Sequence, residues 1–154
     1  MTEQLADLET LARDVRIHVF RETAQTARVP QAPQISRALD RPEADIRAAL
    51  RHLASNKMLI LAPNDGEIWA ANPFCAVPSG FRVDAAARRY WGICIWDALG
   101  IAAALGTDAV ISASCAESSA KMTLEVRNGK LVRSDGVIHF AVPAHHWWDN
   151  IGFT

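Results

Sequence analysis

Three scarcities in this sequence each exclude a class of protein. It has 3 cysteines in 154 residues (Cys75, Cys94 and Cys115), an odd number without the close pairing of a zinc site. The first ten residues, MTEQLADLET, are acidic where a signal peptide is basic and then apolar. The longest apolar region, residues 90–105, contains Asp97 and is too short to cross a bilayer. We therefore expect a cytoplasmic protein whose cysteines are thiols.

An excess of positive charge is also missing. Lysines and arginines number 16 against 17 acidic residues, a formal net charge of -1, and the two signs are balanced on either side of Val83. Neither half is a polycation, so nothing predicts binding to nucleic acid or to an anionic membrane. There are no repeats or low-complexity tracts, and 50% of the residues are hydrophobic, as in globular domains.

The first part of the chain, residues 1–72, has the element order of a winged-helix module. Leucines and valines spaced by three and four predict a helix over 3–27. A short helix, a turn at 40–42 and a longer helix follow, and MLILAPNDGEIWAA predicts a hairpin that turns at Asp65-Gly66. Helix, helix-turn-helix and hairpin is the winged-helix order.

Winged helices often bind DNA, but the residues here favour another role. The predicted recognition helix carries Glu43 and Asp45 at its N-terminal end, where base-reading residues normally lie. The basic residues of the module are matched by acidic ones. We expect a structural or substrate-covering module rather than a DNA-binding one.

The second part of the chain predicts a helix followed by a sheet. Residues 73–87 are loop-like and are expected to be a linker, and a helix is predicted from Arg88 to Leu105. Period-two patterns then predict strands in DAVISAS and in KMTLEVRNGKLVRS, with a tight turn at Asn128-Gly129, and in GVIHFAVP. AHHWWDN predicts a short helical turn and IGFT the opening of another strand. The expected fold class is α+β: a winged-helix-like helical part, then a helix packed on a mostly antiparallel β-sheet over 88–154.

The apolar stretch RRYWGICIWDALG contains one thiol and one carboxyl group, Cys94 and Asp97, three residues apart. On a helix, side chains at this spacing lie on the same face. A lone buried cysteine is usually a small hydrophobe. A carboxyl group in a buried helix instead needs a partner or a raised pKa. The pair therefore suits proton chemistry, with Asp97 as proton donor and Cys94 as a ligand for a soft metal or electrophile.

Several segments together resemble the organomercurial lyase (alkylmercury lyase) family. They are YWGICIWDALGIAAALG, ISASC, MTLEV and VIHFAVPAHHWWDNIGFT. The resemblance covers residues 34–154 and is strongest from Arg88 onward, and the Cys-x-x-Asp element is its specific part. It implies protonolysis of carbon–mercury bonds, which releases a hydrocarbon and mercuric ion, by a site of two cysteines and one aspartate. The family pattern assigns Cys94 as mercury ligand and Asp97 as proton donor and further mercury ligand, mercury being substrate and product, with no cofactor.

The sequence departs from the family pattern at the second catalytic cysteine. Counted from Pro143, that cysteine falls at Thr154 or just after it, where the sequence stops. We expect a shortened chain, a degenerate relative, or a UGA codon meant for selenocysteine, and the sequence leaves all three open. An external thiol is then expected to complete turnover. A sheet interrupted after Thr154 would also leave one edge unpaired, so a homodimer is one expected state. The alternative is a non-catalytic winged-helix regulator or thiol-based heavy-metal sensor.

The remaining chemistry-bearing residues have structural interpretations. Cys115 matches a family cysteine that is structural, and Cys75 is expected to be a loop thiol. His145 and His146 are adjacent, and neighbours on a helix diverge by about a hundred degrees, so they do not predict a zinc site. His139 is expected to be half-buried in its strand. The adjacent tryptophans 147 and 148 are expected to be core beneath the sheet.

Overall fold

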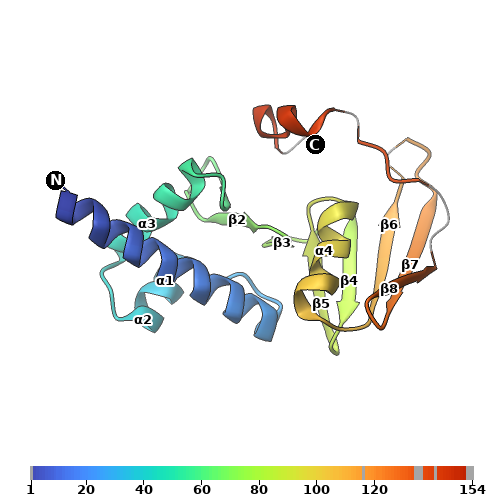
Figure 1. Ribbon diagram of the computed structural model, residues 1–154, viewed down its shortest axis with the longest axis horizontal. Helices are drawn as coiled ribbons and strands as arrows, with labels where there is room; N and C mark the ends of the chain where they lie inside the picture. Colours follow the sequence, from blue (N-terminus) through green and yellow to red (C-terminus); the bar gives the residue numbers. More distant parts are fainter. Residues whose placement is uncertain (1, 116, 134–136, 141, 152–154) are drawn as a thin grey trace. The chain divides into compact units, whose positions relative to one another are not determined.

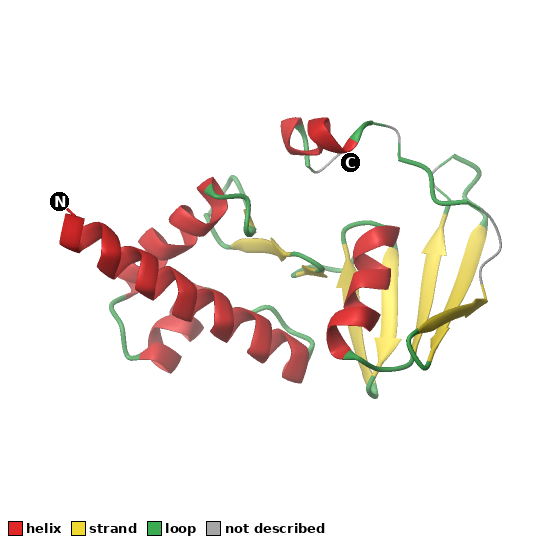
Figure 2. Ribbon diagram, viewed as in Figure 1, coloured by secondary structure: helices red, strands yellow, loops and turns green. Residues whose placement is uncertain are grey.

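The structure is a computed structural model and describes residues 2–115, 117–133, 137–140 and 142–151. The chain divides into two compact units, Met1–Pro78 and Ser79–Thr154. Helices and antiparallel sheets make up both, so the predicted α+β class is confirmed (Figures 1 and 2). No helix among the described residues is long and apolar enough to cross a membrane.

The first unit is a helical cluster with a small sheet. Its elements are α1 (Thr2–Thr26), α2 (Ala32–Leu39), α3 (Glu43–Ser55), β1 (Ile60–Leu61), β2 (Ile68–Ala71) and β3 (Phe74–Cys75), and the sheet order is β1-β2-β3. The three helices share one core, which includes Val15, Ile35 and Leu50, all fully buried. Leu5, the first residue of the apolar pattern that predicted α1, is instead exposed. The helix-turn-helix and the hairpin are confirmed as elements, and their assignment to the winged-helix class stays a prediction.

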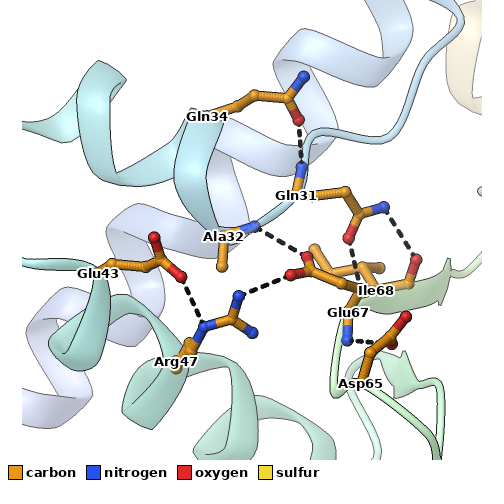
Figure 3. A network of polar contacts seen from close by, with 8 residues as sticks. All are labelled: Gln31, Ala32, Gln34, Glu43, Arg47, Asp65, Glu67 and Ile68. Carbon is orange, nitrogen blue, oxygen red and sulfur yellow. Dashed lines mark hydrogen bonds and ion pairs between the residues drawn. The ribbon is translucent and has the colours of Figure 1, made fainter.

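A polar network ties the hairpin of this unit to its helices (Figure 3). Arg47 on α3 pairs with Glu43 at 2.8 Å and with Glu67 at 2.7 Å, and Glu67 also accepts a hydrogen bond from the backbone N–H of Ala32. The Gln31 side chain accepts from the N–H of Ile68 and donates to its carbonyl oxygen. Arg47 is therefore engaged inside the module.

The second unit is a five-stranded antiparallel sheet with one long helix. Its elements are β4 (Phe81–Ala85), β5 (Arg88–Gly92), α4 (Ile95–Leu105), β6 (Ala109–Ser114), β7 (Lys121–Arg127), β8 (Lys130–Arg133) and the 3-10 helix η1 (Ala144–Asp149). The order is β5-β4-β6-β7-β8, and α4 packs against β4, β5 and β6 (Figure 1). Val83, Tyr90, Ile111 and Leu124 lie in register across the strands and are buried.

Two secondary-structure predictions around the boundary between the units are wrong. The predicted linker 73–87 contains β3 and β4, and the predicted helix from Arg88 to Leu105 begins only at Ile95, because Arg88–Gly92 is β5. The hairpin between β4 and β5 turns at Ala86 and Ala87, both with positive φ. Alanine normally favours helix and rarely adopts such a turn, so the pattern concealed the hairpin.

The predictions for the last part are only partly right. The hairpin at Asn128-Gly129 and the helical turn at 144–149 are confirmed. Residues 137–140 are not in a strand, since an apolar alternation becomes a strand only where a neighbouring strand receives its hydrogen bonds. His139 is exposed, and the two tryptophans are half-buried rather than core. The predicted strand IGFT lies outside the described residues, apart from Ile151, which is in a turn.

The tryptophan segment has local contacts of its own. The rings of Trp147 and Phe140 lie 4.8 Å apart between centroids, and Trp147 Nε1 donates to the carbonyl oxygen of Val142 at 3.0 Å. The His146 ring pairs with Asp149 at 2.8 Å. These contacts join neighbouring residues of the segment.

Candidate functional site

Cys94 and Asp97 lie together at the N-terminus of α4, directly after β5. Cys94 is the residue that caps the helix, with an extended backbone (φ -135, ψ 179), and Asp97 is in the first turn. The Cys94 thiol donates to Asp97 Oδ2 over 3.7 Å. The predicted pairing is therefore observed, although at a helix end and not in the middle of a helix.

The spacing of the pair is that of a capping box. In a capping box, a small polar residue caps the helix and an acid three residues later reaches back to the backbone N–H groups before the first turn. Here the backbone N–H groups of Ile93 and Cys94 interact with the Asp97 carboxyl group. The sequence carried this signal in C-x-x-D, because the same spacing with serine or threonine marks helix starts. Cys94 occupies the N-cap position without a side-chain capping hydrogen bond, so only the carboxyl-group half of the motif is present.

Burial governs the protonation of both groups. Asp97 is only 9% exposed, and its burial raises the pKa of the carboxyl group above 3.8, while the hydrogen bond from Cys94 and the N–H groups of Ile93 and Cys94 act in the opposite direction. Burial likewise raises the pKa of the Cys94 thiol above 9.0, partly offset by the N–H groups of Asp97 and Trp96. At neutral pH the thiol thus keeps its proton until a ligand replaces it.

Close packing brings the pair against the sheet. Gly92, the last residue of β5, lies against the first turn of α4, where a Cβ would come within 2.8 Å of the backbone nitrogen of Ala98. Trp96, which directly precedes Asp97 on this turn, is 61% exposed. The site therefore has a buried acid, a half-buried thiol and an exposed indole within one helical turn.

The other two cysteines are placed elsewhere and are free thiols. Cys75 is buried in β3, not in a loop as predicted, and its thiol donates to the carbonyl oxygen of Trp69 over 3.7 Å. Cys115 follows β6, as predicted, and its Sγ accepts from the N–H of Ser118 at 3.5 Å. Hydrogen bonding from Ser118 lowers the pKa of the Cys115 thiol. Cys115 thus lies outside the Cys94–Asp97 turn and has a thiol whose pKa is lowered.

Among the described residues, no group of three or more histidine, cysteine and acidic side chains is placed to hold a metal ion. The Cys94–Asp97 pair offers one soft and one hard donor. A thiolate suits soft metals, and mercury is among the softest. The arrangement is suited to capturing a soft electrophile and passing it a proton.

Comparison with known proteins finds a family whose profile matches the part of the chain that contains the site. A profile of the MerB family, alkylmercury lyase, matches residues 74–154, which is more than half of the chain. Among proteins with curated descriptions, no sequence matches significantly.

A solved structure shares the fold. The crystal structure of the mercury-bound form of MerB2 is similar to this chain with a TM-score of 0.61 and 17% sequence identity. The similarity covers 83% of this chain and 66% of the other, so the chain spans slightly less than two thirds of that protein. At this identity the likeness concerns the fold.

Proposed function

The chain belongs to the alkylmercury lyase family, and from this premise we propose that it cleaves carbon–mercury bonds by protonolysis. The substrate is an organomercurial cation, and the products are a hydrocarbon and mercuric ion. Cys94 is the mercury ligand, and Asp97 is the proton donor and a second mercury ligand after cleavage. The observation that carries the proposal is the 3.7 Å contact between thiol and carboxyl group at the start of α4.

The first step is capture. The protonated Cys94 thiol gives its proton to the Asp97 carboxylate along their hydrogen bond, and the sulfur forms a bond to mercury. The raised pKa of Asp97 favours acceptance of that proton, since burial opposes the charged carboxylate. After capture, the site holds a sulfur–mercury–carbon unit beside a neutral carboxylic acid.

The second step is protonolysis. The Asp97 acid transfers its proton to the carbon, and the electron pair of the carbon–mercury bond becomes the new carbon–hydrogen bond. Mercury stays divalent and bound to sulfur, so nothing is oxidised or reduced. A proton held beside the reacting carbon gives general acid catalysis, whose usual contribution is about a hundred- to ten-thousand-fold in rate.

A second sulfur is needed to complete turnover. Two thiolates push electron density onto mercury and make the carbon more basic, and exchange onto a free thiol removes the mercuric ion. In this proposal an external small thiol supplies that sulfur. The reducing cytoplasm, which suits three free cysteines, contains such thiols.

The test is product analysis with phenylmercury in excess small thiol. The protein is expected to release benzene at a rate above that of the thiol alone, with one mercuric ion for each benzene. Capture of phenylmercury without any benzene would reject the lyase and leave a thiol-based mercury-binding protein.

A further inference from the structure

Gly92 lies where no side chain fits. A Cβ at this position would be 2.8 Å from the backbone nitrogen of Ala98, 3.1 Å from the carbonyl oxygen of Cys94 and 3.2 Å from the carbonyl carbon of Asp97. These are all backbone atoms, so no rotation of a neighbouring side chain relieves the contact. The glycine is required for space, because it lets the first turn of α4 lie directly on the end of β5.

Ser79 holds the same residue from its carbonyl side. Its hydroxyl donates to the carbonyl oxygen of Gly92 at 2.5 Å and accepts from the N–H of Phe81 at 3.1 Å. Phe81 and Gly92 are partners at the end of the β4–β5 ladder. One hydroxyl group thus bridges the two strand ends where the chain leaves β5 for Cys94.

We propose that Gly92 and Ser79 are positioning residues that set the distance between Cys94 and Asp97, a proposal that rests on the function proposed above. Gly92 allows the helix turn to approach the strand, and Ser79 fixes the peptide from which Cys94 follows. In this role both residues act through Cys94 and Asp97, not on the substrate itself.

The two chemical steps depend on this support to different degrees. Capture of mercury needs only the Cys94 sulfur. Protonolysis needs the acid and the captured carbon in a set geometry, and a displacement of about 1 Å costs on the order of a hundredfold in rate. Loss of the support should therefore slow hydrocarbon release far more than mercury capture.

The first test compares Gly92→Ala with Gly80→Ala in the full chain. Gly80 is a matched control, because a Cβ there would have nothing within 4 Å and its φ is not positive. Gly92→Ala is expected to capture one phenylmercury at Cys94, as the parent does, but to release benzene on the order of a hundredfold more slowly. Gly80→Ala should match the parent in both steps. Equal benzene release by Gly92→Ala and Gly80→Ala would overturn the proposal.

Ser79 variants decide the question if Gly92→Ala does not fold. Ser79→Ala removes the bridging hydroxyl, and Ser79→Thr restores it at a half-buried site. Slow release in Ser79→Ala and recovery in Ser79→Thr would support the positioning role. Unchanged release in Ser79→Ala would overturn the role of Ser79.

A readout without mercury separates this proposal from the lyase proposal. The rate of iodoacetamide alkylation at Cys94, resolved by mass spectrometry, is compared with the rate at Cys115 in the same molecules. Gly92→Ala and Ser79→Ala should raise this ratio severalfold, because the thiol is released from Asp97. If the ratios of Gly92→Ala and Ser79→Ala equal that of Gly80→Ala, the positioning role is overturned even if the parent cleaves phenylmercury. If these two variants raise the ratio but the parent releases no benzene, only the lyase proposal is rejected.

Discussion

At the scale of single residues, two thiols of this chain have different surroundings. Burial raises the pKa of the Cys94 thiol, whereas hydrogen bonding from Ser118 lowers that of Cys115. Simple mercury uptake therefore does not distinguish the two sites, since a thiol of lower pKa binds mercury without help. Their difference is that Cys94 alone donates to a buried carboxyl group, Asp97.

Serine at each thiol gives the first prediction. Cys94→Ser should abolish hydrocarbon release while a mercury adduct still forms at Cys115. Cys115→Ser should lose that adduct and some stability in the turn after β6, yet release hydrocarbon as the parent does. Site-resolved mass spectrometry measures the mercury adduct at each cysteine, and gas chromatography measures the released hydrocarbon. Benzene release by Cys94→Ser at the parental rate would remove Cys94 from the mechanism.

Asparagine at Asp97 gives the second prediction. The amide has nearly the same shape but no proton to transfer, so Asp97→Asn should capture phenylmercury at Cys94 and release benzene roughly a hundred- to ten-thousand-fold more slowly. Excess small thiol must be present in each reaction. If the variant cleaves as fast as the parent, Asp97 is a capping residue only.

At the scale of elements, the first turn of α4 combines a cap with a chemical site. Asp97 stabilises the start of the helix through the N–H groups of Ile93 and Cys94, but its burial opposes the charged form. The sequence predicted the residue pair and not its setting. Tyr90 and Gly92 face the core, as alternate residues of a strand do. The alanines before this strand and the apolar residues after it have a spacing that is also typical of a helix, so the sequence predicted a helix instead of the strand.

The third prediction is a dependence of stability on pH. The folded protein raises the pKa of Asp97 above its ordinary 3.8, so it binds this proton more tightly than the unfolded chain does. The stability from Asp97 is full below the ordinary pKa and is lost as pH rises through the folded value. Asp97→Asn should flatten the fall in unfolding free energy over this window, measured by urea titration at a series of pH values. An identical pH profile in parent and variant would contradict the burial of the charge.

The fourth prediction concerns α3. The predicted recognition helix contains Arg47, but this side chain pairs with Glu43 and Glu67, and the helix begins with acidic residues. The phosphate-driven part of DNA affinity should therefore be small. Fluorescence anisotropy with duplex DNA at moderate salt should show no sequence-specific binding. Tight binding that depends on sequence would favour the regulator over the enzyme.

At the scale of the whole molecule, local signals were easier to predict than long-range pairing. The Asn128-Gly129 hairpin and the turn before α3 were predicted because both depend on a few neighbouring residues with special backbone preferences. The pairing of β4 with both β5 and β6 was missed, since it joins segments whose only shared feature is burial. The same limit applied to Gly92 and Ser79, whose roles depend on a contact that spacing does not reveal.

The family, the fold and the site lead to one central claim, that this chain breaks a carbon–mercury bond by adding a proton to carbon. The most direct test is a single turnover of phenylmercury in D2O with excess small thiol, followed by mass spectrometry of the hydrocarbon. The Asp97 carboxyl group exchanges its proton with the solvent, so the account predicts benzene that carries one deuterium, released at the rate of mercuric ion formation and lost in Asp97→Asn. Benzene without deuterium, or no benzene from a protein that has bound phenylmercury at Cys94, would contradict it.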